Sequence, residues 1–309
     1  MKFAMVFPGQ GSQTVGMLDA WSDNQAAAQV LSQADAALGE DLSGLIANGP
    51  AEKLNLTTNT QPAMLTASLA MLAAWRAAGG PEATVMAGHS LGEYAALCAA
   101  GAIDLADAVR LVRIRADAMQ AAVPVGTGAM AAILGLEDDA VLAVCEQASQ
   151  GEIVEAVNFN APSQVVIAGH KAAVERAMEN AKAAGAKRAV LLPVSAPFHA
   201  SLLKPAATVL ASALSEMTLR APVIPVIHNV DVQMHNDPAS IAQALVDQAW
   251  HPVRWVQTIE AMAQQGVTHV VECGPGKVLS GMVKRIDASM TAISLSDPAS
   301  LQTAIDQLN

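Results

Sequence analysis

Blocks of apolar and polar residues follow one another along the chain with the spacing of helices and strands. The first block, KFAMVF at residues 2–7, is an apolar run of strand length. Two later apolar segments, VIPVIHNV at 223–230 and HVVECGP at 269–275, are also predicted strands. Helical periodicity is found at roughly 17–49, 61–79, 104–122, 202–217, 238–249 and 255–265, and again in the terminal region. This alternation indicates an α/β protein.

The stretch 126–195 has an order of elements of its own. It reads as strand GAMAAILG, helix EDDAVLAVCEQAS, strands IVEAVNF and QVVIAGH, helix KAAVERAMENAKAAG and strand KRAVLLPV. That order is βαββαβ, the split βαβ arrangement. We therefore expect a small ferredoxin-like domain at 126–195. It would be inserted into a large α/β-hydrolase-like domain with a parallel sheet, formed by residues 1–125 and 196–309.

One short segment, AGHSLGEYAALCAA at 87–100, places Ser90 between Gly88 and Gly92. Apolar residues precede it and a helical pattern follows, which is the strand–turn–helix context of a G-x-S-x-G nucleophile elbow. The glycines remove Cβ atoms from a tight turn, and the helix directs free N–H groups toward a developing oxyanion. An ordinary glycine-rich turn has the same local pattern, so the motif alone does not decide the role of Ser90.

A serine nucleophile needs a base within hydrogen-bond reach, and histidine is the usual one. The chain has seven histidines. His199 differs from the others because VSAPFHASL places it just after the last strand of the small domain. There the chain re-enters the large domain, and a cleft between domains is a common ligand site. His199 is therefore the expected partner of Ser90.

Composition and charge exclude several classes of protein. The most apolar stretch, residues 63–75, is too short to span a bilayer, and the N-terminus lacks the apolar region of a secretory signal. We expect a cytoplasmic protein. Cys98, Cys145 and Cys273 are too few and too far apart for a disulfide framework or zinc site. The formal net charge of −11 argues against a nucleic-acid binder.

Six motifs occur in a characteristic order. They are FPGQGSQ at 7–13, TQPA at 60–63, GHSLGEY at 88–94, NFNAP at 158–162, PFH at 197–199 and GPGKVL at 274–279. With these motifs the chain resembles the malonyl-CoA:acyl carrier protein transacylases, acyltransferases of fatty acid and polyketide synthesis, over nearly its whole length. The resemblance implies malonyl transfer from malonyl-CoA to the phosphopantetheine thiol of acyl carrier protein, for fatty acid biosynthesis. It implies a malonyl-serine intermediate and ping-pong kinetics, and no cofactor or metal is expected.

The resemblance also implies catalytic roles for particular residues. Ser90 would attack the thioester, and His199 would act as general base and then as acid toward the leaving thiol. The backbone N–H groups of Gln10 and Leu91 would form the oxyanion hole. No Asp or Glu is recognisable as the group that orients His199, and the carbonyl of Gln248 is implied as that acceptor.

Arg115 matches the arginine that pairs bidentately with the malonyl carboxylate, a geometry that lysine cannot supply. On sequence grounds alone, an arginine on this helix is also explained by a solvated surface position. The further substrate-binding positions implied by the resemblance are Met119, Met130, Phe198, Asn160 and Gln61. Phe198 departs from the serine that bacterial housekeeping enzymes often carry before the histidine. Its ring should restrict an α-methyl group on the substrate. A malonyltransferase of polyketide synthesis or of malonate decarboxylation therefore remains an alternative.

Two further classes remain open at this point. A serine thioesterase or esterase uses the same elbow, and a non-catalytic subunit binds carrier protein or acyl-CoA without turning it over. For a partner, the acyl carrier protein is strongly acidic, so docking requires a local basic surface on this acidic chain. The expected docking residues are Lys187, Arg188, Lys284 and Arg285.

Overall fold

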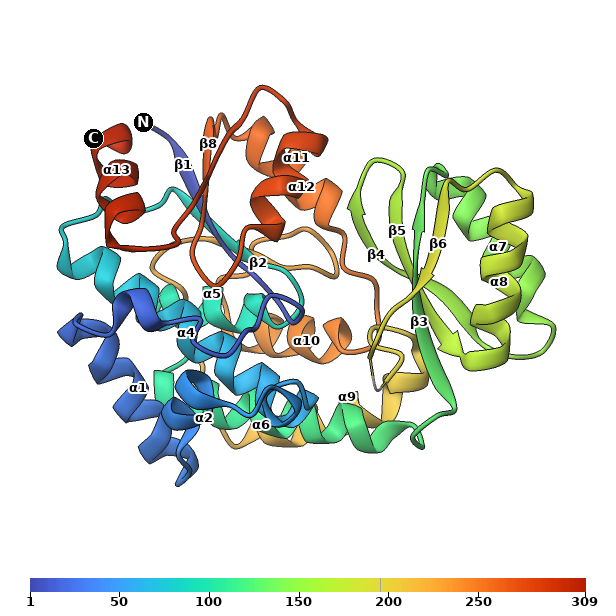
Figure 1. The fold of residues 1–309 in the computed structure, drawn as a ribbon, viewed down its shortest axis with the longest axis horizontal. Coiled ribbons are helices and arrows are strands. Elements are labelled where there is room, and N and C mark those ends of the chain that lie inside the picture. Colours follow the sequence, from blue (N-terminus) through green and yellow to red (C-terminus); the bar gives the residue numbers. More distant parts are fainter. Residues whose placement is uncertain (195) are drawn as a thin grey trace.

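The computed structural model describes residues 1–194 and 196–309. The helices and strands form two units, each built on its own sheet (Figure 1). We call the part that contains the smaller sheet, residues 128–191, the small unit, and the remainder the large unit. The expected domain boundary at residue 195 falls on the one position outside this description.

The large unit contains a five-stranded sheet whose strands all run parallel. In order of pairing they are β7 (Val226–Ile227), β2 (Val85–Gly88), β1 (Phe3–Phe7), β8 (His269–Glu272) and β9 (Thr291–Ser294). β1 and β2 are buried along their whole length, as in a parallel sheet covered on both faces. The predicted α/β class and parallel sheet are confirmed.

Helices cover both faces of this sheet. They are η1 (Asp19–Trp21), α1 (Gln25–Leu38), α2 (Leu42–Asn48), α3 (Ala51–Leu54), α4 (Thr57–Ala77), α5 (Gly92–Ala99), α6 (Leu105–Ala122), η2 (Ser201–Leu203), α9 (Lys204–Ser215), α10 (Pro238–Gln248), α11 (Trp255–Gln264), α12 (Val278–Ile286) and α13 (Pro298–Leu308). Phe3, Met5 and Phe7 of β1 belong to the core with α4 and α5, whereas Ala4 and Val6 pack with α11 and α12. This division follows from the alternation of side chains along a strand. No helix of the described residues is both long and apolar enough to cross a bilayer.

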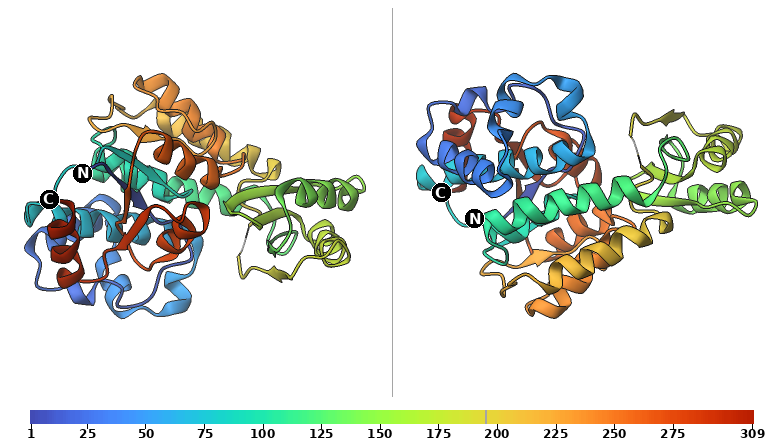
Figure 2. Two further views of the ribbon diagram at one scale, coloured as in Figure 1. Left: turned by 90° about the horizontal axis from the view of Figure 1, so that it is seen from above. Right: turned by 90° about the horizontal axis from the view of Figure 1, so that it is seen from below.

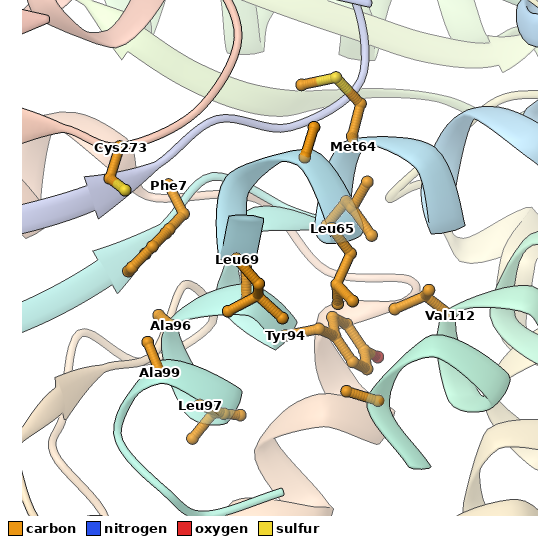
Figure 3. Packing of buried hydrophobic residues seen from close by; sticks show 14 of the residues in the cluster. Phe7, Met64, Leu65, Leu69, Tyr94, Ala96, Leu97, Ala99, Val112 and Cys273 are labelled. Atoms are coloured by element: carbon orange, nitrogen blue, oxygen red, sulfur yellow. The ribbon is translucent and has the colours of Figure 1, made fainter. Parts of the chain in front are cut away.

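The core beneath the sheet is formed mainly by α4, α5 and α6. Tyr94 of α5 is fully buried and lies between Leu65 of α4 and Val112 of α6 (Figure 3). Phe7, at the end of β1, points into the same cluster toward Ala96 of α5 (Figure 3). Because a close-packed interior resists displacement, these contacts fix the start of α5 relative to the end of β1.

The small unit contains a four-stranded antiparallel sheet covered on one face by two helices. Its strands pair in the order β4 (Val154–Ala161), β5 (Gln164–His170), β3 (Gly128–Leu134) and β6 (Arg188–Leu191), and its helices are α7 (Asp138–Ser149) and α8 (Lys171–Ala183). The predicted chain order βαββαβ is observed. Met130 and Val166, on the face without helices, belong to the core cluster of the large unit. That face therefore turns toward the large unit.

The small unit extends from one end of the large unit (Figure 2), and hydrogen bonds hold its β4 edge against that unit. The N–H of Val253 donates to the carbonyl of Val157 (2.9 Å), and the N–H of Phe159 donates to the carbonyl of Val253 (3.0 Å). Ser201 donates through its N–H and its hydroxyl to the carboxylate of Glu155, at 2.7 and 2.8 Å. The two units are thereby held in a defined orientation along one side of the region between them.

Three strands differ from the sequence prediction. β7 covers only Val226–Ile227 of the predicted 223–230, and β6 covers Arg188–Leu191 of the predicted strand at 187–194. The amides of His228 and Asn229 donate to Gln233 and Glu93 instead of continuing a ladder. β9 lies in the terminal region, which was predicted to be helical.

Candidate active site

A cleft of about 800 Å³ lies between the two units. One wall is formed by the loop at 8–13 and by the turn at 89–91 of the large unit. The facing wall comes from β3, β4 and β5 of the small unit and from residues 192–194, while the start of α12 closes one end. The cleft therefore lies at the carboxyl ends of β1 and β2, the usual position of ligand sites in parallel α/β sheets.

Ser90 occupies a sharp turn between β2 and α5 at the base of this cleft. Its φ is 52°, in the left-handed region that non-glycine residues seldom adopt. A Cβ atom on Gly88 would lie 1.8 Å from the backbone of Gly92, and one on Gly92 would lie 2.0 Å from the carbonyl of Phe7. Both glycines are therefore required by close backbone contact, and the strained serine projects into the cleft.

His199 is the histidine in contact with Ser90. Its Nε2 lies 2.7 Å from Ser90 Oγ, and its Nδ1 lies 2.8 Å from the carbonyl oxygen of Gln248. The carbonyl accepts a hydrogen bond from Nδ1–H, which leaves Nε2 as the basic nitrogen that faces the serine. Burial, and then the positive charge of Arg115, lower the pKa of His199 to about 3. The imidazole is therefore neutral at physiological pH.

The backbone N–H groups of Gln10 and Leu91 both belong to residues that line the cleft. Within the described residues, neither N–H donates a hydrogen bond to another part of the chain. Leu91 directly precedes α5, so the positive end of that helix also faces this region. These two donors are free to bind an oxygen that develops negative charge.

Arg115 is almost completely buried, at 2% exposure, and its guanidinium lies beside Ser90. Nη2 donates to Ser90 Oγ at 3.1 Å and to Gln248 Oε1 at 2.9 Å, and Nη1 donates to Gln61 Oε1 at 2.8 Å. The guanidinium also lies 5.2 Å from the centre of the Tyr94 ring. Burial lowers the pKa of Arg115, but arginine remains charged in proteins, so the site holds a fixed positive charge next to the serine.

The other predicted substrate-binding residues take different positions. Met130, Phe198, Asn160 and Gln61 line the cleft. Met119 does not line it: this side chain is fully buried, and its sulfur lies 3.8 Å from the Nε2 of Gln61. A buried thioether at this point fills core space behind the cleft wall.

Comparison with known proteins agrees with this geometry. The family model of the acyl transferase domain matches residues 4–296. The chain belongs to the acyl transferase domain family.

Individual relatives of this acyl transferase domain are similar over almost their entire length. The malonyl CoA-acyl carrier protein transacylase of Escherichia coli strain K12 is 55% identical over 306 residues, which cover 99% of each chain. The crystal structure of an acyl-carrier-protein S-malonyltransferase from Burkholderia pseudomallei 1710b is 60% identical, with a TM-score of 0.98 over 99% of this chain and 100% of that one. A malonyl-transacylase solved in complex with its type II PKS acyl-carrier protein is 49% identical, with a TM-score of 0.98 over 99% and 100%.

Sequence reasoning missed a buried polar network behind Ser90 and Arg115 of this acyl transferase domain. Asn229 accepts a hydrogen bond from the N–H of Ser90 (2.7 Å) and donates to the carbonyl of Gly88 (2.7 Å). Glu93 is completely buried and contacts His228, Asn229 and Gln248. The sequence implied a role only for the carbonyl of Gln248, but its side chain contacts Arg115 and Ser90 as well. Its neighbours are more than 130 positions away in sequence, so no local motif indicates these contacts.

The four basic residues predicted for docking lie at two places on the surface. Lys187 and Arg188 are exposed at the start of β6, whereas the cleft is lined by residues 192–194, beyond the end of that strand. Lys284 is exposed on α12, whose first residues line the cleft. Arg285 is engaged with the small unit, because it donates to the carbonyl of Pro162 (2.9 Å) and to Gln164.

Proposed function

We propose that this chain transfers a malonyl group from malonyl-CoA to the phosphopantetheine thiol of an acyl carrier protein, through an ester on Ser90. The observation that carries the proposal is the buried Arg115 guanidinium 3.1 Å from Ser90 Oγ. A fixed positive charge at that distance favours an acyl group that carries its own carboxylate. The relatives named as malonyl transacylases support the same substrate.

In the first half-reaction, Ser90 Oγ attacks the thioester carbonyl while His199 Nε2 takes the hydroxyl proton. The carbonyl oxygen becomes negative and is stabilised by the N–H groups of Gln10 and Leu91. The C–S bond then breaks, and the protonated His199 gives its proton to the leaving sulfur of coenzyme A. The malonyl carboxylate offsets the charge of Arg115, which raises the pKa of His199 and helps it to hold the proton.

In the second half-reaction, His199 takes the proton from the pantetheine thiol of the carrier protein. The sulfur attacks the ester carbonyl, the bond to Ser90 Oγ breaks, and His199 returns its proton to that oxygen. The chain's own groups and the two thiols account for every bond and proton. We therefore propose that the reaction needs no cofactor or metal.

Substrate selection is assigned to the residues of the cleft wall. Arg115, held by Gln61 and Gln248, binds the acyl carboxylate. Phe198 is 9% exposed and lines the cleft, where its ring would meet an α-methyl substituent. Met130 and Asn160 would contact the acyl and pantetheine groups. Met119 supports Gln61 from behind and is not proposed to touch the substrate.

We also propose the domain organisation expected from sequence. The strand order β4-β5-β3-β6 with two helices on one face supports a ferredoxin-like small domain at 126–195. The parallel sheet with a serine in the turn between β2 and α5 supports an α/β-hydrolase-like large domain of residues 1–125 and 196–309. Three free cysteines fit a reducing compartment, and we propose the cytoplasm.

The carrier protein is proposed to dock over the rim of the cleft, guided by Lys187, Arg188, Lys284 and Arg285. Exposure of these basic side chains and the position of α12 at the cleft support this assignment. We propose that the malonyl group is transferred for fatty acid synthesis. The neighbour solved with a type II PKS carrier protein favours polyketide synthesis as the second candidate.

A single mass spectrometry experiment tests the proposed function. The protein is incubated with equal amounts of malonyl-, methylmalonyl- and acetyl-CoA, and the peptide that carries Ser90 is analysed before and after holo carrier protein is added. The expected result is a malonyl adduct on Ser90 that is stable in water and is discharged by the carrier protein. An adduct that water removes as fast as carrier protein does would identify a thioesterase instead.

A further inference from the structure

Glu93 is a buried acidic side chain that the proposed chemistry does not use. It lies in the first turn of α5, three residues after Ser90, and is 0% exposed. Its Oε1 lies 2.7 Å from His228 Nδ1, while Oε2 accepts from the N–H of Asn229 and from Gln248 Nε2, both at 2.9 Å. A buried carboxylate is costly unless it is hydrogen-bonded, and here both oxygens have partners. The two bonds to Oε2 lead directly to groups that contact the reacting residues.

The first connection runs through the side chain of Gln248. Its Nε2 donates to Glu93 and to the carbonyl of Ser90, so both neighbours of this nitrogen are acceptors. Its Oε1 consequently points the other way and accepts from Arg115 Nη2 at 2.9 Å. If the amide were reversed, its NH₂ group would face the guanidinium and its oxygen would face the carboxylate. Glu93 and the carbonyl of Ser90 together determine which end of the amide meets Arg115, and Glu93 is the one of the two that a side-chain substitution can remove.

The second connection runs through Asn229. Its backbone N–H is held by Glu93, and its side chain bonds both to the N–H of Ser90 and to the carbonyl of Gly88. These bonds bridge the turn in which Ser90 has a φ of 52°. This connection supports the nucleophile whatever acyl group is transferred, whereas the Gln248 connection concerns only the group that binds a carboxylate.

We propose that Glu93 is a positioning residue that orients the amide of Gln248 and thereby aims Arg115 at the carboxylate of the acyl group. The inference rests on the proposed malonyl transfer. It predicts a specific consequence: loss of the Glu93 acceptor reduces the preference for malonyl over acetyl groups, in addition to any general loss of rate. A purely structural role would lower both transfers by the same factor.

Three substitutions separate these possibilities. Glu93→Leu removes both acceptor oxygens with little change in volume. Glu93→Asp keeps the oxygens but moves them away from Asn229 and Gln248 by the length of one methylene group. Glu93→Gln keeps an oxygen for Asn229 and Gln248, because its NH₂ group can face His228, whose ring can present Nδ1 as an acceptor in the other tautomer. The Gln variant is therefore the conservative control, and the Asp variant replaces the Leu variant if the latter does not fold.

A matched control is Glu272, a second fully buried glutamate. It accepts from the N–H groups of Leu279 (3.0 Å) and Ser280 (2.7 Å) at the other side of the sheet and does not contact Arg115, Gln248 or Ser90. Glu272→Gln and Glu272→Asp report what the loss of a buried carboxylate does to stability and overall rate. The ratio of malonyl to acetyl transfer should not change in them.

The experiment measures Ser90 acylation rates with malonyl-CoA and acetyl-CoA separately, together with the thermal midpoint of each variant. We expect the malonyl-to-acetyl ratio to fall about tenfold in Glu93→Leu, the effect of one unsatisfied buried donor, and by a smaller factor in Glu93→Asp. Glu93→Gln should keep the ratio near that of the wild type. An unchanged ratio in the Leu or Asp variant would overturn the inference while leaving malonyl transfer intact. A wild type that forms no malonyl adduct would instead refute the proposed function itself.

Discussion

His199 Nε2 lies 2.7 Å from Ser90 Oγ, although the two residues are 109 positions apart in the sequence. The contact joins the turn after β2 to the segment that follows the small unit, so it depends on the tertiary fold and not on local sequence. The second ring nitrogen is held by a backbone carbonyl, which no side-chain substitution at Gln248 deletes. The geometry of the pair is thus set by the fold rather than by a third catalytic side chain.

The first prediction concerns this pair. Ser90→Ala should abolish the malonyl adduct, because the attacking oxygen is missing. His199→Ala should slow adduct formation by roughly 10³-fold or more, since the base of a nucleophile pair is lost. Intact-mass measurement after rapid mixing with malonyl-CoA gives both results. An acyl group found on a cysteine of the wild type would contradict the assignment of Ser90.

The second prediction is a pH profile for Ser90 acylation. Burial and the charge of Arg115 lower the pKa of His199 to about 3, so the imidazole stays unprotonated to a lower pH than usual. The acylation rate should therefore remain level as the pH falls from about 8 to about 5. A base with an ordinary pKa near 6.5 would lose about thirtyfold in rate over that interval.

Acetyl-CoA is the suitable donor for this profile, because it brings no carboxylate that would offset Arg115. In Arg115→Ala, the positive charge is absent, and the pKa of His199 rises. The decline in rate with acetyl-CoA should accordingly begin at a higher pH than in the wild type. An inflection near pH 6.5 in the wild-type protein would show that the histidine is not held in its neutral form.

The third prediction concerns selectivity. Arg115→Ala should lose malonyl transfer and narrow the preference for malonyl over acetyl by about 2–5 kcal/mol, because the acyl carboxylate would be left unpaired in a buried site. Arg115→Lys keeps the charge but not the planar fork, so it should restore only part of the preference. Rates of Ser90 acylation with each acyl-CoA provide the comparison.

Arg113 provides a matched control on the same helix. It pairs with Glu40 at 2.7 Å at the surface of the large unit and is absent from the cleft wall. Arg113→Ala should leave the malonyl-to-acetyl ratio unchanged. Equal losses of both transfers in Arg115→Ala would mean that this residue only supports the structure.

Local sequence was sufficient to predict the strand, turn and helix that carry Ser90. Glycines two positions before and after the serine, an apolar strand before it and a helical pattern after it are all encoded within a few residues. Gln10, Leu91, Gln248 and Arg115 followed from resemblance, because their proximity depends on chain segments that only the fold brings together. The contacts of the Gln248 side chain were not predicted, because its neighbours Glu93 and Arg115 come from α5 and α6.

The errors in the predictions of β7 and β9 have physical explanations. Pro225 has no N–H to donate, and the amides of His228 and Asn229 bond outside the sheet, so β7 is limited to Val226–Ile227. β9, at Thr291–Ser294, has the sequence TAIS, in which only two residues are apolar, so no apolar run marks it as a strand. Neither element supplies a residue of the cleft wall, and the candidate site was unaffected.

The last prediction concerns the carrier protein. The chain has a formal charge of −11, so an acidic partner is repelled unless basic residues gather near the cleft. Lys187, Arg188 and Lys284 are exposed and engaged in no ion pair within the described residues. Reversal of these three to glutamate should raise the apparent KM for carrier protein and leave Ser90 malonylation by malonyl-CoA nearly unchanged. Arg285 is best tested separately, because its bond to Pro162 joins the two units.

The matched control reverses Lys2, Lys171 and Lys182, which are exposed and absent from the cleft wall, so that the net charge changes by the same amount. If only total charge matters, both triple variants raise KM equally, and the local docking surface is refuted. If docking is local, the control retains a KM closer to that of the wild type. Charge attraction is screened beyond a Debye length of about 8 Å at physiological salt, and it acts mainly on the association rate. The difference in KM between the wild type and the first variant should therefore shrink as salt is added. A difference in KM that persists unchanged at high salt would indicate the loss of direct contacts and not of electrostatic steering.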